Sequence, residues 1–100
     1  MWLMVMFDLP VKTKKERKAA YVFKRDLLRD GFTMMQLSVY VRHCSDSQNA
    51  ETHIRRVRDA CPGTGRVSIA QITDRQYENM INIYGKKIIK NSGPQQLELF

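Results

Sequence analysis

Residues 2–10, WLMVMFDLP, decide the fold of this chain. Six apolar residues, Trp2 to Phe7, are followed by Asp8 and then by Pro10. A continuous apolar run of this length, closed by a turn signal, is typical of a strand in the middle of a sheet that is buried on both faces. The run lacks a basic leader and a small-residue cleavage site and is too short to span a bilayer. We therefore expect neither a signal peptide nor a membrane anchor.

A helix is predicted directly after this strand. Thr13 and Glu16 form a T-x-x-E capping box, which marks the start of a helix. The apolar positions that recur at helical spacing are Ala20, Phe23, Leu27 and the neighbouring Leu28. Gly31 then ends the helix, because glycine readily takes the left-handed conformation that terminates one.

The next two strands and a second helix follow without a long linker. Residues 32–43, FTMMQLSVYVRH, are rich in β-branched and aromatic residues and predict two strands that meet at a sharp turn near residues 36–38. Residues 45–49 supply candidate N-caps for a helix. Its buried stripe is predicted at Ala50, Ile54, Val57 and Cys61. Residues 62–65, PGTG, end this helix.

The last third of the chain is less regular. Residues 66–73, RVSIAQIT, alternate with apolar residues on both sides and predict another well-covered strand. Residues 74–84 have apolar residues at helical spacing, but Asn79 and Asn82 weaken the prediction of a helix. Residues 86–91 predict a short strand, and the tail QQLELF at residues 95–100 could pair as an edge strand on another chain or fray.

The predicted order of elements is β, α, β, β, α, β with a C-terminal extension. This is the ferredoxin-like, or split βαβ, arrangement of the α+β class. We predict one domain over residues 1–100, of which residues 85–100 form the C-terminal strand and tail. Two helices on one face leave the other face of the sheet uncovered, so we expect a homodimer that pairs through this face or adds a strand to its neighbour.

The charge balance favours an anionic partner. The chain has 17 Lys and Arg against 10 Asp and Glu, a formal net charge of +7. Phosphate backbones are the commonest partners of such proteins, whereas no segment shows the apolar helical face that a membrane surface would require. Two cysteines are too few for a disulfide framework and fit a reducing cytoplasm.

The basic residues gather on the first predicted helix. Lys14, Lys18, Arg25 and Arg29 stand at i, i+4, i+11 and i+15, which places them near one helix face. The further candidates for nucleic-acid binding are Lys12, Lys15, Arg17 and Lys24 around this stripe, and Arg55, Arg56, Arg58 and Arg66 as a second basic cluster. Such a surface can follow a phosphate backbone. The alternative is a solvated helix face that Asp26 and Asp30 partly neutralise.

Other residue types carry weaker signals. The chain has no aromatic single-strand-binding pattern, so we favour recognition of a duplex backbone, and we interpret the four tyrosines, Tyr21, Tyr40, Tyr77 and Tyr84, as core or interface residues. Two histidines and two cysteines, His43, Cys44, His53 and Cys61, match no zinc-ligand spacing. Ser38 has no adjacent base and is expected to serve the turn.

Two motifs in the right order resemble the small CRISPR-associated protein family Cas-two. They are the apolar strand that ends in Asp8 and Pro10 before a basic helix, and Gln36-Leu37-Ser38-Val39-Tyr40, which is similar to that family's Q-x-S-V-aromatic signature. The resemblance covers nearly the whole chain. It implies a ferredoxin-like homodimer whose C-terminal strand crosses to the partner. It further implies a complex with the CRISPR integrase, called Cas-one, and with protospacer duplex DNA during spacer acquisition.

The same resemblance implies a catalytic and metal-binding role for Asp8. Many members are recorded as Mg²⁺-dependent endonucleases for RNA or DNA, and Asp8 matches their expected Mg²⁺ ligand. One carboxylate is a poor Mg²⁺ site, whereas two copies of Asp8 across a two-fold axis would supply a pair. The alternative for Asp8 is an Asx turn before Pro10. Met34 stands where many members carry a basic residue, a departure that counts against nuclease activity.

Two functional hypotheses therefore follow from the sequence. In the first, a non-sequence-specific homodimer holds duplex DNA and bridges integrase dimers, and Asp8 is dispensable. In the second, the chain is a stand-alone Mg²⁺-dependent endonuclease or toxin-like endoribonuclease centred on Asp8. A ligand-binding regulatory module of the same fold is disfavoured by the positive charge and by the lack of a ligand-cradling glycine loop.

Overall fold

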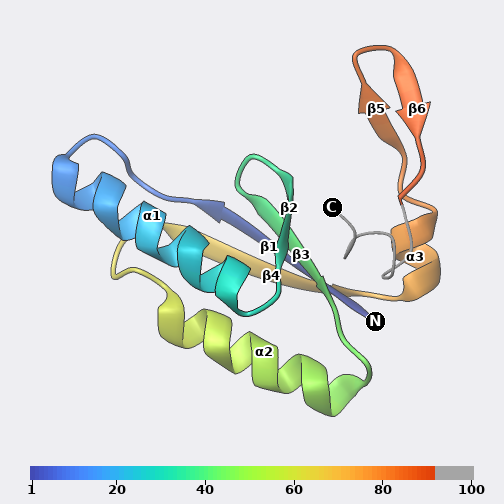
Figure 1. The fold of residues 1–100 in the computed structure, drawn as a ribbon, viewed down its shortest axis with the longest axis horizontal. Coiled ribbons are helices and arrows are strands. Elements are labelled where there is room, and N and C mark those ends of the chain that lie inside the picture. Colours follow the sequence, from blue (N-terminus) through green and yellow to red (C-terminus); the bar gives the residue numbers. More distant parts are fainter. Residues whose placement is uncertain (92–100) are drawn as a thin grey trace.

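A four-stranded antiparallel sheet and two helices make up the body of the protein (Figure 1). The computed structural model describes residues 1–91. The sheet consists of β1 (Trp2–Asp8), β2 (Thr33–Gln36), β3 (Val39–His43) and β4 (Arg66–Ile72) in the order β2-β3-β1-β4. The long helices are α1 (Lys14–Arg29) and α2 (Ser47–Ala60). This order of elements confirms the predicted ferredoxin-like fold of the α+β class.

The ends of α1 follow directly from local sequence. Thr13 is the N-cap, and its side chain and that of Glu16 satisfy each other's backbone N–H groups, as the capping box predicts. At the other end, Gly31 has a φ of +87°. The N–H of Phe32 donates to the carbonyl of Leu27 at 3.0 Å, and that of Gly31 donates to Leu28 at 3.1 Å. These two bonds form a Schellman motif that ends the helix.

The main core lies between the sheet and the two helices. β1 contributes Leu3, Val5 and Phe7, because alternate residues of a strand point to the same face. The helices cover them with a set of buried residues that includes Phe23 and Leu27 of α1 and Ala50 and Val57 of α2. The predicted stripe of α2 is confirmed, since Ile54 and Cys61 also pack against this core. The prediction for α1 is confirmed for Ala20, Phe23 and Leu27 but is wrong for Leu28, which is 53% exposed.

The other face of the sheet is only partly covered, and we call it the open face. Its members include Met4, Met6 and Asp8 of β1, Val39 of β3, and Ser68 and Ala70 of β4, which stand opposite one another in the strand register. Met6 is 36% exposed and Asp8 is exposed as well. The prediction that the first strand is buried on both faces is therefore wrong for this half of β1. Its central position in the sheet is confirmed.

β4 also differs from the prediction. It forms an edge of the sheet, and its residues alternate between exposed and half-buried over most of its length. The expected alternation is present, because Val67 and Ile69 pack against the main core while Ile72 packs on the other side. The strand is not well covered, since among residues 1–91 no neighbouring strand protects its outer edge, and Ser68 on its open face is exposed.

The segment after β4 forms a short helix and a separate hairpin. α3 (Asp74–Glu78) is held by a second capping box between Thr73 and Gln76. Tyr77 of α3 stacks on Trp2 with ring centroids 3.9 Å apart and so covers one end of the open face. β5 (Asn82–Tyr84) and β6 (Lys87–Ile89) pair with each other, with no further strand partner in the described part of the chain, and project from the body (Figure 1).

The hairpin refines the prediction for this region. β6 confirms a strand within residues 86–91, whereas β5 lies in the segment whose helical spacing seemed ambiguous from sequence. Asn82 is buried, and its side-chain amide donates to the carbonyl of Ile89 at 3.0 Å and to Oδ1 of Asn91 at 2.8 Å. The amide thus joins the two strands at their base. The predicted tail at residues 95–100 lies outside the described residues.

Candidate Asp8 site and nucleic-acid interface

Asp8 is the last residue of β1 and lies at the end of the open face. Its partner in the register is Arg66, the first residue of β4. Cross-strand partners point to the same face of a sheet, so the carboxylate and the guanidinium share this end. Both residues line a hollow of about 240 Å³. We call it the Asp8 hollow, and it is lined by Met6, Phe7, Asp8, Arg66 and Ser68.

Two tight turns fix the backbone around the Asp8 hollow. The N–H of Phe7 donates to the carbonyl of Ser38 at 3.1 Å, which ties the turn between β2 and β3 to β1. Ser38 has a φ of +65°, an unusual value for a non-glycine residue and consistent with its predicted service in the turn. Gly65 has a φ of +82°, and a Cβ there would lie 2.8 Å from the carbonyl oxygen of Asp8. Both sequence motifs therefore meet at the end of the sheet that carries Asp8.

A single chain does not build a metal site around Asp8. Within residues 1–91, no group of three or more His, Cys, Asp or Glu side chains is placed to hold a metal ion. Mg²⁺ prefers octahedral oxygen coordination and is usually held by one or two carboxylates together with substrate phosphates. Asp8 alone meets that requirement poorly. An Mg²⁺ site here would need oxygen atoms beyond those of residues 1–91 of one copy, such as a second Asp8.

The basic stripe of α1 lies on the side of the helix that faces away from the core. Lys14, Lys18 and Arg29 are exposed, and Arg25 is half-buried and contacts Asp26 at 3.3 Å. Tyr21 lies on the same side and is 66% exposed. This exposure contradicts a core role for Tyr21 and leaves the interface interpretation, whereas Tyr40 and Tyr77 are buried as predicted. The stripe thus combines cations with one aromatic ring.

Besides Arg25, two further residues predicted to bind nucleic acid have partners within the chain. The guanidinium of Arg17 donates to the carbonyls of Val11 and Lys12 at 3.2 and 3.0 Å, and so closes the loop before α1. The guanidinium of Arg56 donates to Asp30 at 2.8 Å. Lys12, Lys15 and Arg55 are exposed, and among the described residues no ion pair involves them. These three are better placed than Arg17 and Arg56 to meet a phosphate.

The predicted second basic cluster is divided between two faces. Arg55, Arg56 and Arg58 belong to α2, in the helical layer. Arg66 belongs to the open face, because its strand neighbour Val67 packs against the helices. Their closeness in the sequence predicts one surface, but the loop at residues 61–65 leads into β4, where strand alternation directs Arg66 to the open face.

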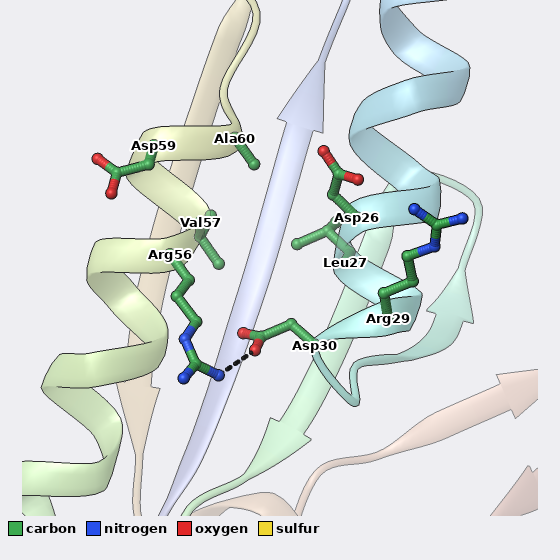
Figure 2. Close-up of a pocket in the computed structure, with 8 residues that line it drawn as sticks. All are labelled: Asp26, Leu27, Arg29, Asp30, Arg56, Val57, Asp59 and Ala60. Carbon is green, nitrogen blue, oxygen red and sulfur yellow. Dashed lines mark hydrogen bonds and ion pairs between the residues drawn. The ribbon is translucent and has the colours of Figure 1, made fainter.

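A polar tie between α1 and α2 was not predicted. Asp30, the C-cap of α1, has a side chain that is 13% exposed and lies 2.7 Å from Nδ1 of His53. Its other carboxylate oxygen accepts from Arg56, which reaches across from α2 (Figure 2). From the sequence, Asp30 is expected to neutralise part of the basic stripe. Its partners are instead His53 and Arg56 on the other helix, 23 and 26 residues away.

The groove that this tie closes is the pocket of Figure 2. It has a volume of about 430 Å³, and Leu27, Val57 and Ala60 give it apolar walls. Its charged members are of both signs, with Asp26, Asp30 and Asp59 beside Arg29 and Arg56, and Asp59 points away from α1. Because Arg56 and Asp30 already pair across this groove, its charges serve the packing of α1 on α2, and the exposed basic stripe is the stronger candidate for a polyanion.

The ionisable groups with shifted pKa values lie elsewhere in the molecule. Burial raises the pKa of the Cys44 thiol, and burial likewise raises the pKa of Cys61 and of Tyr77. The amino group of Met1 donates to Asp74 at 2.6 Å and holds the pKa of that carboxyl below its usual value, with His43 adding to the effect. None of these groups reaches the Asp8 hollow, so they contribute to structure.

Comparison with known protein families matches residues 1–80 to the family described as CRISPR associated protein Cas2, the Cas-two family of the sequence resemblance. A protein of Flavobacterium psychrophilum is 48% identical over 101 aligned positions, which cover 100% of this chain and 88% of the relative. A protein of Parvibaculum lavamentivorans is also 48% identical, with 100% of both chains covered. Both relatives are named CRISPR-associated endoribonuclease Cas2. No helix within the described part of the chain is long and apolar enough to cross a membrane.

Proposed function

This chain belongs to the Cas2 family of CRISPR-associated proteins, and on that premise we propose that it is a homodimer that binds duplex DNA and bridges integrase dimers during spacer acquisition. The observation that carries the proposal is the basic stripe on the outer side of α1. Its role is positional, because it holds phosphates while the integrase partner performs strand transfer.

The geometry of α1 supports backbone binding. At about 1.5 Å per residue, the 16 residues of α1 span roughly 24 Å, a length over which a DNA duplex carries many phosphates. Lys14, Lys18 and Arg29 project from one side of the helix at exposed positions. Each phosphate that they neutralise releases counterions, so binding should weaken steeply with salt and depend little on sequence.

The open face and the hairpin support the homodimer. Met4, Met6, Val39 and Ala70 leave apolar surface on the open face. The hairpin and the residue before it expose five large apolar side chains: Ile81, Ile83, Tyr84, Ile88 and Ile89. An isolated two-stranded hairpin is marginally stable in water, and contiguous exposed apolar surface marks an interface. A second copy of the chain would cover both surfaces, with β6 as the strand that joins the partner's sheet.

The bridging role rests on the family and on symmetry. A two-fold dimer presents the same surface twice, at opposite ends of the assembly. Two integrase dimers could therefore dock equivalently on either side of one DNA segment. The strand exchange by the C-terminal part of the chain belongs to the same family expectation.

A gel-shift titration with a duplex of about 30 base pairs tests the DNA interface. We expect the variant Lys14→Glu/Lys18→Glu to lose binding at physiological salt, because it replaces two phosphate contacts with repulsion. The matched control Arg75→Glu/Lys86→Glu changes the net charge equally, but on α3 and on the hairpin turn. Equal loss in both variants would show that net charge, and not the α1 stripe, governs binding and would overturn the proposal.

A second candidate function is a metal-dependent endonuclease centred on Asp8. It is favoured by the relatives' name, endoribonuclease, and by an exposed carboxylate that lies in a hollow beside a guanidinium. Mg²⁺ would act as a Lewis acid toward the phosphodiester, and the two Asp8 carboxylates of a dimer would hold it together with the substrate. RNA is the substrate that the relatives' name suggests for this activity, and DNA is the alternative.

Cleavage assays separate the two candidates. Purified wild type and Asp8→Ala are incubated with duplex DNA and with RNA, in Mg²⁺ and in EDTA. The endonuclease predicts cleavage only by wild type in Mg²⁺. Salt-sensitive DNA binding without any cleavage would leave the scaffold as the function and make Asp8 a turn residue.

A further inference from the structure

We propose that Arg66 binds the phosphodiester on which Asp8 acts, so that the Asp8 hollow is a two-residue phosphate site rather than a lone carboxylate. The inference rests on the proposed endonuclease function of Asp8. It adds a substrate-binding residue from a different strand, which the sequence motifs do not mark.

The strand register places the two side chains together. Asp8 and Arg66 are paired at the end of β1 and the start of β4, and both are exposed. No ion pair joins them, and within residues 1–91 neither takes part in any other salt bridge. Both residues line the hollow of about 240 Å³. A carboxylate and a guanidinium that face a shared space without contacting each other leave room for a ligand that bears negative charge.

The backbone holds Arg66 in this position. Gly65 packs against the carbonyl of Asp8 so closely that a Cβ would lie 2.8 Å from that oxygen and equally close to Cδ2 of Leu9. Its φ of +82° also disfavours any other residue. The start of β4 is therefore fixed against the end of β1, and Arg66 cannot drift away from Asp8 without breaking this contact.

Electrostatics explain why an Asp8-centred site needs such a residue. A lone carboxylate repels the phosphate that it is meant to approach, and this repulsion is strong near a protein surface. Arginine presents a planar fork that binds a phosphate through two parallel hydrogen bonds. Arg66 thus offsets the repulsion and orients the phosphodiester across the hollow. The exposed hydroxyl of Ser68 on the same wall can donate a further hydrogen bond.

The open shape of the hollow fits a polymer backbone. Asp8, Arg66 and Ser68, which line it, are exposed in the single chain, so a chain of nucleotides could pass over it at the edge of the proposed dimer surface that contains Met6. Arg66 is also separated from the α1 stripe by the thickness of the sheet, because Val67 beside it packs toward the helices. Its contribution can therefore be measured apart from that of the stripe.

The test compares Arg66→Ala and Arg66→Lys with Arg75→Ala, which removes an equal charge from α3. In Mg²⁺ we expect Arg66→Ala to lower kcat/KM for RNA cleavage by roughly 10- to 100-fold, the loss typical of one charge-assisted hydrogen-bonded contact. Arg66→Lys should recover part of the loss because it keeps the charge without the fork. Arg75→Ala should remain within about twofold of wild type.

A second measurement keeps the inference independent of catalysis. In the Asp8→Asn background and in EDTA, the affinity for a short RNA is measured by fluorescence anisotropy with Arg66 or Ala at position 66. We expect roughly tenfold weaker binding for Arg66→Ala and no comparable change for Arg75→Ala. If wild type cleaves nothing, the endonuclease function fails while this affinity comparison still decides the role of Arg66. Equal behaviour of the Arg66→Ala and Arg75→Ala variants in both measurements would overturn it.

Discussion

The two faces of β1 differ sharply although both are built from apolar residues. Leu3 and Val5 are 0% exposed beneath α1 and α2, whereas Met6, between Val5 and Phe7 in sequence, is 36% exposed on the open face. Asp8 continues the exposed series. The first face is completed by helices of the same chain. The second contains the Asp8 hollow and the surface that we assign to a partner, so one strand serves both the fold and the function.

This difference shows that the apolar composition of a strand does not reveal whether its own chain or a partner chain covers each of its faces. A run such as WLMVMF indicates burial on both sides, and burial by a second copy satisfies that pattern as well as burial by a helix does. Each of the following substitutions changes one face of the sheet, and the measurement shows whether folding or association is affected.

The largest effect is expected from truncation on the covered face. Leu3→Ala removes a fully buried side chain, and the lost burial and the cavity should lower the free energy of unfolding by about 3 kcal/mol. Met6→Ala should cost less than about 1 kcal/mol, because its side chain is already partly in water. Urea unfolding of dilute protein measures both. Equal losses would show that the open face is as well packed within one chain as the covered face.

A charge on the open face should act on association and not on folding. Met6→Glu places a carboxylate in the proposed dimer surface next to Asp8, where it loses hydration and meets like charge from the partner. We expect the dimer dissociation constant to rise by about 100-fold, with urea unfolding of the monomer changed by less than about 1 kcal/mol. Sedimentation velocity over a concentration series measures the first quantity, and Met6→Leu is the apolar control. An unchanged dimer would place the interface elsewhere, with the exposed hairpin as the next candidate.

The polar tie on the helical side should contribute less than the apolar core beneath it. Asp30→Ala leaves the buried imidazole of His53 without its partner at 2.7 Å, and we expect a loss of about 2 kcal/mol in the free energy of unfolding. Arg56→Ala, which removes only the exposed partner, should cost under about 1 kcal/mol. Thermal unfolding followed by circular dichroism compares them. A larger effect of Arg56→Ala would contradict the view that His53 carries the tie.

Local sequence signals predicted most of the fold. The capping box at Thr13, the left-handed Gly31 and the stripe through Ala50 and Val57 all fix elements from residues within a few positions of one another. The order of elements then limited the topology to the observed ferredoxin-like sheet. These features depend on short-range chemistry, which a single sequence displays.

The missed features depend on contacts between distant residues. Asparagine has a low helix propensity, so Asn82 weakens the prediction of a helix. Its side-chain amide, however, donates hydrogen bonds to residues 7 and 9 positions later in the chain and joins the two strands of the hairpin. His53 looks like a polar residue beside an apolar stripe, and only the packing of α1 on α2 brings Asp30 to it. Arg66 seems close to the arginines of α2 in sequence, but strand alternation turns it to Asp8. No local pattern encodes these partners.

The labelling rates of the two cysteines measure how readily the covered side of the sheet opens. Cys44 is 1% exposed within the main core, whereas Cys61 is half-buried at the end of α2. At pH 8 in native buffer, we expect a thiol-specific reagent to label Cys61 first and Cys44 at least about tenfold more slowly, because Cys44 must await local opening of the core. The variant Cys61→Ser isolates the signal of Cys44. Equal labelling rates would mean that the core beneath α2 opens as readily as its margin.

The pH dependence of this labelling has a definite sign. Burial raises the pKa of both thiols above 9.0, so each is less ionised in the folded protein than in the unfolded chain. The rate should therefore rise as the pH passes 9 and should rise further on unfolding in urea. The same shift favours the folded state below pH 9, and that contribution declines above it, because the unfolded thiols then release protons that the folded ones retain. Cys44→Ala and Cys61→Ser should therefore each flatten the alkaline loss of stability when urea unfolding is followed over a pH series, and an alkaline loss unchanged in both variants would show that the buried thiols do not cause it.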